Sequence, residues 1–354
     1  MTADTVGGVF THAVDLAAGL RGEGVEVALA TFGRRMSAVQ RSRVRDSGAE
    51  LVLESPLALE WMPEPWADVQ AAEELLLGLE RRLAPDVVHL NAFAHGAAAW
   101  EAPVLVAGHS CVCSWWLAVH GGAPPVSWDR YRRAVRAGIA GAAAVTAPTT
   151  TMLGELERWY GPLPAVSRAI LNGSAYAGPA VAPAKRLVAV SAGRLWDEAK
   201  NAGALVRVAG RPRLRGRVML AGEGDAGGEA RLLGALDPAA LARLRRAAAV
   251  YAAPALYEPF GLGILEAARD HCALVLGDIA SLRELWDGAA VFVAPGDDER
   301  LAAELERLLG DPAAAAALGE RARRRSLRYS VRAMTRGYLA LYRSLVRSPD
   351  PVAA

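Results

Sequence analysis

Short apolar runs alternate with amphipathic segments along almost the whole chain. Each run is about as long as an ordinary strand, and apolar residues recur at helical spacing between the runs. This alternation is typical of βαβ units and predicts parallel sheets covered by helices. The predicted strands cover residues 25–33, 49–55, 86–91, 102–110 and 142–149 in the first half, and residues 186–194, 216–224, 247–255, 272–278 and 289–295 in the second.

The two sets of strands are separated by residues 172–185, which are rich in glycine, proline and alanine as inter-domain linkers often are. A chain of 354 residues is also long for a single core. We therefore predict two doubly wound, Rossmann-like α/β domains, residues 1–175 and 176–330. Residues 331–354 form a C-terminal helical tail whose apolar face must pack on a neighbour, and packing back across the domain junction is one option.

Ligands of open parallel sheets bind outside the carboxyl ends of the strands, so the loops that follow strands carry most information. The loop 191–201 offers Arg194 and Lys200 after a predicted strand, and Lys200 is one of only two lysines among 40 basic residues. A guanidinium fork and a compact ammonium would clamp a diphosphate here. The alternative is a pair of surface charges that face Asp197 and Glu198.

Glycine residues concentrate in the same region of the second half. Gly193 precedes the two basic side chains, and Gly222 opens the loop 221–228, which follows the next strand and contains four glycines. A bare backbone lets a flat or anionic ligand approach closely, although tight turns use the same residues.

The stretch YEPFGLGILEA places Glu258 and Glu266 on either side of a glycine-containing turn. Residues 261–269 should form a helix whose N-terminal amides, exposed by Gly261 and Gly263, suit a phosphate. Glu266, one turn into this helix, can accept hydrogen bonds from adjacent ribose hydroxyls, while Glu258 would reach a different hydroxyl-bearing group. The alternatives are a helix-dipole partner for Glu266 and a solvated turn residue for Glu258.

The first half offers weaker candidates. Gly7 and Gly8 precede an amphipathic helix but lack the spacing of a dinucleotide fingerprint, which argues against a nicotinamide dehydrogenase. His109 follows a predicted strand and could hydrogen-bond or protonate a ligand, and Trp115 and Trp116 could stack on a sugar ring. A single histidine is more often structural, and tryptophans are more often part of a core.

Composition excludes some classes of function. The net charge of +2 is too small to indicate nucleic acid as the main partner. Three cysteines without paired CxxC motifs indicate neither a disulfide framework nor a metal site. No secretory signal or membrane span is visible, so we expect a cytoplasmic protein, with peripheral contact at the inner face of a membrane as the minority interpretation of its basic clusters.

These segments together resemble the retaining glycosyltransferases of family 4, the group 1 glycosyltransferases of GT-B architecture. YEPFGLGILEA is similar to that family's Glu-x7-Glu motif, GRLWDEAKN to its Gly-Arg…Lys phosphate loop, and GGVFTHAVDLAAGL to its N-terminal glycine loop and helix. The resemblance covers nearly the whole chain. It implies two Rossmann-like domains that face a cleft, with the acceptor bound mainly by the first and the nucleotide sugar by the second.

The resemblance also implies roles for individual residues. Arg194 and Lys200 would hold the donor diphosphate, Glu266 the nucleotide ribose and Glu258 the donor sugar. The implied catalytic residues are His109, Arg194, Lys200 and Glu258. The implied donor-binding residues are Gly7, Gly8, Gly193, Arg194, Lys200, Gly222, Glu258, Phe260, Gly261, Leu262 and Glu266.

The function implied is transfer of a hexose from a nucleotide-diphosphate sugar to an acceptor hydroxyl with retention of configuration, without a metal or a tightly bound cofactor. The acceptor is a carbohydrate, a lipid-linked molecule or a small natural product. Two alternatives share the architecture, namely a nucleotide-sugar epimerase and a catalytically silent partner subunit. The sequence does not define the donor nucleotide, the sugar or the linkage.

Three departures from the family pattern lead to further expectations. The spacing from Arg194 to Lys200 is one residue longer than usual. The segment ARDHCALVLGD lacks the usual glycine and proline, which we expect to be a structural change with little bearing on chemistry. Only residues 1–5 precede the N-terminal glycine loop, so the first strand is expected to be missing, and about six to eight upstream apolar residues would supply it.

Overall fold

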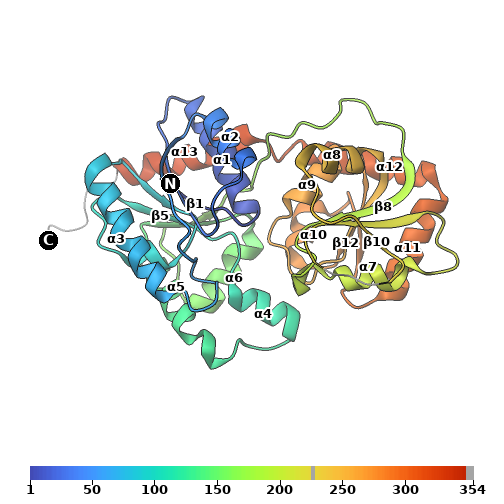
Figure 1. Cartoon of the computed structure of the whole chain (residues 1–354), viewed down its shortest axis with the longest axis horizontal. Helices are drawn as coiled ribbons and strands as arrows, with labels where there is room; N and C mark the ends of the chain where they lie inside the picture. Colours follow the sequence, from blue (N-terminus) through green and yellow to red (C-terminus); the bar gives the residue numbers. More distant parts are fainter. Residues whose placement is uncertain (225–227, 348–354) are drawn as a thin grey trace. The chain divides into compact units, whose positions relative to one another are not determined.

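The computed structural model describes residues 1–224 and 228–347. The chain forms two compact units (Figure 1). The first unit contains Met1–Trp116, Gly122–Ala175 and the chain from Ser330 onward, and the second contains Leu117–Gly121 and Tyr176–Tyr329. Within the described residues every paired strand is parallel to its neighbour, so the predicted α/β class is confirmed for each unit.

The first unit alternates strands and helices from its first residues. Its strands are β1 (Thr2–Asp4), β2 (Ala28–Phe32), β3 (Glu50–Glu54), β4 (Val88–Leu90), β5 (Val104–Ala107), β6 (Ala144–Ala147) and β7 (Arg168–Ala169). Its helices are α1 (Gly8–Arg21), α2 (Ala38–Ser47), α3 (Trp66–Leu83), α5 (Asp129–Gly141), α6 (Thr150–Tyr160) and α13 (Val331–Arg347), with α4 (Val112–His120) divided between the units and short 3-10 turns at Ala94–Ala97 and Val126–Trp128.

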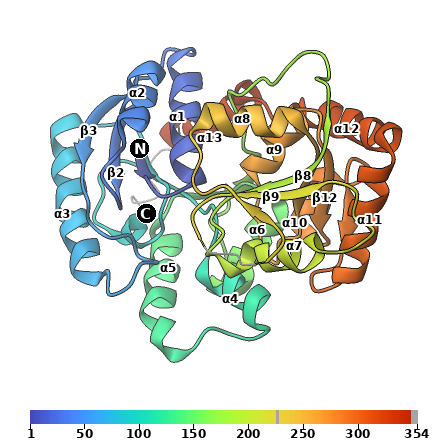
Figure 2. The same cartoon turned by 45° about the vertical axis from the view of Figure 1, so that its right-hand side comes forward.

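The strands of the first unit form two sheets, in the orders β1-β2-β3 and β4-β5-β6-β7. Figure 2 shows α1 and α2 on one side of β2 and β3 and α3 on the other. The alternation of β2 explains this arrangement, because Leu29 packs with α1 and α2 while Ala30 and Phe32 pack with α3.

The expectation that the first strand is missing is wrong, because residues 2–4 form β1. This strand pairs with β2, with Thr2 opposite Ala30 and Asp4 opposite Phe32. Thr2 is also tied to the end of β4, because the side-chain amide of Asn91 donates to the carbonyl of Thr2 at 2.7 Å. So short a strand needs no apolar run, since backbone pairing and the buried side chain of Ala3 hold it.

The C-terminal helix α13 belongs to the core of the first unit. Its residues Met334, Tyr338, Leu341 and Leu345 are buried in one cluster with Leu16 and Leu20 of α1 and with Leu105 of β5. Gly19 makes the close contact of α1 and α13 possible, because a Cβ atom at Gly19 would lie 2.0 Å from Oγ1 of Thr335. The helical periodicity of the tail therefore reflects packing within this unit.

The second unit contains one six-stranded sheet in the order β10-β9-β8-β11-β12-β13. Its strands are β8 (Arg186–Ala192), β9 (Arg217–Ala221), β10 (Arg231–Leu232), β11 (Ala248–Ala253), β12 (Ala273–Gly277) and β13 (Val291–Val293). Its helices are α7 (Ala202–Ala209), α8 (Pro238–Ala247), α9 (Leu262–Arg269), α10 (Ala280–Trp286), α11 (Asp298–Gly310) and α12 (Pro312–Ser326), with a 3-10 turn at Glu198–Lys200.

Helices cover both faces of this sheet, with α8 and α9 on one side and α7 on the other (Figure 1). Along β12, Ala273 and Val275 pack in the cluster that contains α7 and α11, whereas Leu274 and Leu276 pack with α9 and α10. A strand buried on both faces reads as a continuous apolar run, which is why these strands were predictable. Each strand predicted from the sequence contains one observed strand.

Candidate functional site

Three of the predicted loops come together in the second unit, at the carboxyl ends of β9, β8 and β11. The amide of Gly193 donates to the carbonyl of Ala221 at 3.0 Å, and the amide of Leu195 donates to that of Glu223 at 2.9 Å. The amide of Leu256 donates to the carbonyl of Ala199 at 2.9 Å. Because the three strands are neighbours in a parallel sheet, their following loops share one edge.

Lys200 and Glu258 form an ion pair across this edge. Nζ of Lys200 donates to Oε2 of Glu258 at 2.8 Å, and the side chains are 25% and 19% exposed. The sequence assigned the two residues to different parts of a ligand and did not predict their contact. A partly exposed pair contributes little stability, about 0–1 kcal/mol, so a ligand can separate it at small cost.

Arg194 lies in the same loop and is held by its neighbours. Its Nη2 donates to Oδ2 of Asp197 at 2.9 Å, and its guanidinium lies 5.4 Å from the ring centroid of Trp196. The alternative prediction of a contact with Asp197 is therefore confirmed for Arg194. A guanidinium has five N–H donors, and this bond uses one of them, so the contact leaves Arg194 able to bind an anion.

The loop of Gly222 approaches the loop of Gly193 so closely that a side chain on Gly222 would not fit. A Cβ atom on Gly222 would lie 1.7 Å from the carbonyl oxygen of Gly193, and the backbone of Gly222 has φ +145°. In the loop 221–228, residues 225–227 lie outside the described residues. Gly222 thus serves close backbone packing, which is one of the two explanations that the sequence allowed, whereas a Cβ atom on Gly193 would meet no atom within 4 Å.

We expect Gly222→Ala to lower the melting temperature by about 5 °C or more, because the clash with a backbone atom forces the loops apart. Gly288→Ala is the matched control, since Gly288 also has positive φ (+75°) but no atom within 4 Å of an added Cβ. Thermal denaturation of both variants tests the point. Equal decreases in melting temperature for the two variants would show that backbone strain alone, and not the close approach of the loops, causes the destabilisation.

The turn before α9 has the predicted form. Gly261 adopts a left-handed conformation, with φ 82°, and is the N-cap residue of the helix Leu262–Arg269. The side chain of Phe260 is buried in the core and packs edge-on against Tyr329. Phe260 can therefore meet a ligand only through its backbone. The first amides of a helix have no intrahelical acceptors, so this helix start suits an anion.

Glu266, one turn into α9, is paired with a residue that the sequence did not single out. Its Oε2 lies 2.9 Å from Nη1 of Arg245, which belongs to the last turn of α8. The carboxylate is 25% exposed, so a ligand can still reach it. Arg245 occurs within the run RLRRA, where nothing in the spacing distinguishes it from a solvated helix residue.

The remaining predicted residues lie in the first unit. Gly7, with φ 130°, is the N-cap residue of α1, and Gly8 is its first residue. Nε2 of His109 lies 2.7 Å from Oδ1 of Asn91. Because the amide nitrogen of Asn91 donates to Thr2, its Oδ1 must accept, which makes His109 the donor through Nε2.

His109 belongs to a group of three histidines. Its ring centroid lies 4.5 Å from that of His12, and the ring centroid of Tyr338 lies 5.6 Å from that of His12 and 5.2 Å from that of His89. Burial lowers the pKa of His109 to about 4, and burial together with the neighbouring histidine lowers the pKa of His12 well below its usual range. A neutral His109 accepts through Nδ1 and is a poor proton donor near pH 7, so of the two predicted roles hydrogen bonding fits better.

The same histidines predict how stability changes with pH. His12 and His89 are buried and have lowered pKa values, so as pH falls below about 6.5 the unfolded chain binds protons that the folded chain does not. The melting temperature should therefore fall between pH 7 and pH 5. His12→Gln should flatten this dependence, whereas replacing the exposed His120 should not. A melting temperature that is constant over this range would contradict the prediction.

Within residues 1–224 and 228–347, no group of three or more His, Cys, Asp or Glu side chains is arranged to hold a metal ion. In the same part of the chain, no helix combines the length and the apolar character needed to cross a membrane.

Solved structures share the fold over nearly the whole chain. Sucrose-phosphate synthase from Thermosynechococcus elongatus is 20% identical with a TM-score of 0.79, and the match covers 97% of this chain and 98% of that one. HepE from Anabaena, in complex with UDP and glucose, is 16% identical with a TM-score of 0.76, over 97% and 100% of the two chains. These GT-B glycosyltransferases confirm the predicted fold class.

A curated relative is similar over a shorter stretch. The phosphatidyl-myo-inositol mannosyltransferase of Mycolicibacterium smegmatis is 35% identical over 125 residues, which are 34% of this chain and 32% of that protein. The match thus spans about a third of the length of that relative.

Family models match both halves of the chain. The model of Glycosyltransferase Family 4 matches residues 6–173, and the model of Glycosyl transferases group 1 matches residues 187–325. The second match contains Arg194, Lys200, Glu258 and Glu266. The chain therefore belongs to the group 1 glycosyltransferases, with an N-terminal half of the family 4 type.

Proposed function

We propose that this protein transfers a hexose from a nucleoside-diphosphate sugar to an acceptor hydroxyl, with retention of configuration. One observation carries the proposal. The second unit gathers two cations, two carboxylates and a helix N-terminus at the carboxyl edge of one parallel sheet. These are the groups that a diphosphate, a ribose and a sugar require, and they stand where open α/β sheets bind ligands.

The donor-binding roles follow from the chemistry of each group. Arg194 and Lys200 bind the diphosphate, together with the first amides of α9. Glu266 accepts hydrogen bonds from the two ribose hydroxyls. Glu258 binds the donor sugar, and it leaves Lys200 when the diphosphate arrives. Without a ligand the two side chains neutralise each other, which keeps both charges paired at the open edge of the sheet.

Rate enhancement comes chiefly from stabilising the charge that develops on the departing diphosphate. Arg194, Lys200 and the start of α9 are in place before the bond breaks, so little reorganisation is needed during the reaction. The first unit binds the acceptor. Retention and the hexose are part of the proposal because of the family resemblance, and the similar proteins include a mannosyltransferase and a protein solved in complex with UDP and glucose.

A turnover assay tests the proposal. The protein is incubated with UDP-, GDP-, ADP- and dTDP-hexoses, with and without sugar, lipid-linked and small-molecule acceptors, and the free nucleotide is measured. We expect one donor to release its nucleotide only when an acceptor is present, with the anomeric configuration of the product determined by NMR. Conversion of a donor without an acceptor would favour the epimerase, and an inverted product would contradict retention.

A further inference from the structure

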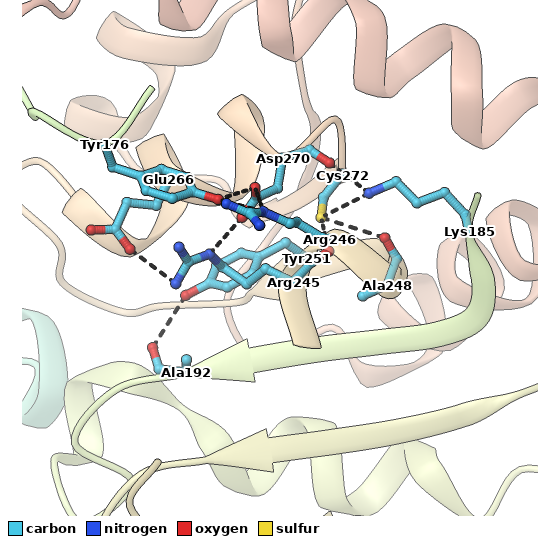
Figure 3. A network of polar contacts seen from close by, with 10 residues as sticks. All are labelled: Tyr176, Lys185, Ala192, Arg245, Arg246, Ala248, Tyr251, Glu266, Asp270 and Cys272. Atoms are coloured by element: carbon cyan, nitrogen blue, oxygen red, sulfur yellow. Dashed lines mark hydrogen bonds and ion pairs between the residues drawn. The ribbon is translucent and has the colours of Figure 1, made fainter. Parts of the chain in front are cut away.

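Arg245 lies between two carboxylates at the two ends of one helical turn. Its Nη1 is 2.9 Å from Oε2 of Glu266, and its Nε donates to Oδ2 of Asp270 at 3.0 Å (Figure 3). Glu266 and Asp270 are four residues apart, so they lie on the same face of α9. The planar guanidinium contacts both carboxylates at once, that of Glu266 through Nη1 and that of Asp270 through Nε.

The contact with Asp270 is the buried end of this arrangement. The side chain of Asp270 has no exposed surface, that of Arg245 is 4% exposed, and that of Glu266 is 25% exposed. Exposure thus increases from Asp270 through Arg245 to Glu266. Burial opposes the charge of Arg245, but the carboxylates of Glu266 and Asp270 outweigh it and raise its pKa, so the guanidinium stays charged.

Further contacts fix Asp270 and Arg245. The hydroxyl of Tyr176 donates to Oδ1 of Asp270, and the ring of Tyr176 lies 5.2 Å from the guanidinium of Arg245. In Figure 3 these residues form a continuous network, with Glu266 at one end and with Lys185 and Cys272 at the other. Nζ of Lys185 donates to the backbone carbonyl of Asp270 at 2.6 Å. Arg245 therefore has little freedom to leave Glu266.

The segment that supplies Asp270 departs from the family pattern. The resemblance leads us to expect a glycine and a proline in this segment. His271 lies there instead with φ +60°, a conformation that residues with side chains rarely adopt. Its Nε2 lies 3.2 Å from the carbonyl oxygen of Pro179. Asp270 precedes His271 in this segment and contacts Arg245, the partner of Glu266.

We propose that Arg245, anchored by Asp270, is a positioning residue that holds the carboxylate of Glu266 oriented for the two hydroxyls of the donor ribose. The inference rests on the proposed function, because it assumes that Glu266 binds the ribose. A carboxylate whose rotamer is already fixed loses less conformational freedom on binding, so Arg245 increases affinity for the ribose and not for the diphosphate.

The test compares nucleotides that differ only in the ribose hydroxyls. Dissociation constants are measured for UDP, GDP and ADP and for their 2′,3′-dideoxy forms, with wild type, Arg245→Gln and Arg245→Lys. The wild type should prefer the ribose form of its nucleotide by about 10- to 100-fold. Arg245→Gln should reduce this ratio to within about threefold of unity and leave the affinity for the dideoxy form unchanged. Arg245→Lys should reduce the ratio in the same way, because a single ammonium cannot contact both carboxylates at once.

Arg246→Gln is the matched control. Arg246 is the next residue of α8. Its Nε lies 3.6 Å from Oδ1 of Asp270 and donates to the hydroxyl of Tyr176. Among the described residues its ion pair is thus with Asp270 and not with Glu266. Its loss should leave the ratio unchanged. Should Arg245→Gln fail to fold, Arg245→Gln with Asp270→Asn removes the uncompensated buried charge, and the same reduction is expected.

The outcomes separate this inference from the proposed function. A folded Arg245→Gln that keeps the wild-type ratio would overturn the role of Arg245 alone. A wild type that binds nucleotides without preferring ribose would overturn the role of Glu266 and, with it, that of Arg245. A wild type that binds none of the six nucleotides, and does not bind dTDP either, would overturn the proposed function itself.

Discussion

Replacement of Lys200 by alanine should reduce kcat for sugar transfer about 100- to 1,000-fold while the fold stays intact. This is the usual cost of removing one preorganised donor from a developing negative charge. The fold should survive because Lys200 is partly exposed and its ion pair with Glu258 contributes little to stability. The loss should lie mainly in kcat if the diphosphate gains charge in the transition state.

The only other lysine of the sequence provides the control. Nζ of Lys185 donates to the backbone carbonyl of Asp270 and lies 3.7 Å from Sγ of Cys272. Lys185→Met should lower the melting temperature and leave kcat at saturating donor close to that of the wild type, because Lys185 supports the residues that hold Glu266 and has no assigned contact with the diphosphate. Turnover of Lys200→Ala near the wild-type rate would remove Lys200 from the catalytic groups.

A second variant distinguishes two roles of Lys200. If Lys200 binds the diphosphate, Lys200→Ala should weaken binding of a nucleoside diphosphate. Glu258→Gln should not weaken it, because a nucleoside diphosphate lacks the sugar that Glu258 binds and because this change releases Lys200 from its ion pair. If Lys200 serves only to neutralise Glu258, both variants should bind the nucleoside diphosphate as the wild type does. Isothermal titration of both proteins decides between the two.

Replacement of Glu266 by glutamine should weaken nucleotide binding by about 10- to 100-fold, the usual effect of losing hydrogen bonds to a charged acceptor. The fold should hold, because Arg245 keeps its buried partner Asp270 and is not left as an isolated charge. The effect should appear in the dissociation constant of the nucleoside diphosphate and in KM for the donor more than in kcat.

Glu198→Gln is the control for the change in charge. Glu198 lies in the loop of Arg194 and Lys200 and is exposed, and no role in nucleotide binding is assigned to it. Its replacement should leave the dissociation constant within about twofold, as surface changes usually do. Equal losses for Glu198→Gln and Glu266→Gln would mean that overall charge, and not contact with the ribose, governs binding.

Much of the fold was predictable from the sequence because strands buried on both faces read as apolar runs. The strands that escaped prediction have no such run. Residues 2–4, Thr-Ala-Asp, have no apolar alternation, and β7 and β10 consist of two residues each and are defined by pairing alone. Strands of this kind exist because neighbouring strands accept their hydrogen bonds, and this information lies outside their own sequence.

The candidate site was predictable in its parts and less so in its contacts. Loops after adjacent parallel strands share one edge, which brought the segments of Gly193, Gly222 and Glu258 together as expected. The pairing of Lys200 with Glu258 joins residues 58 positions apart, and its geometry depends on the folded backbone. The role of Arg245 was not predicted, because a buried arginine and a solvated arginine cannot be distinguished by sequence within a run of basic residues.

Thermal stabilisation by nucleotides is the most direct test of a donor site in the second unit, because a ligand that binds only the folded state raises the melting temperature. The protein is heated with UDP, GDP, ADP and dTDP and with their common hexose conjugates. We expect one nucleotide and its sugar conjugate to raise the melting temperature clearly, and we expect Glu266→Gln to lose most of this shift. A protein whose melting temperature responds to none of these compounds would contradict a donor site in the second unit.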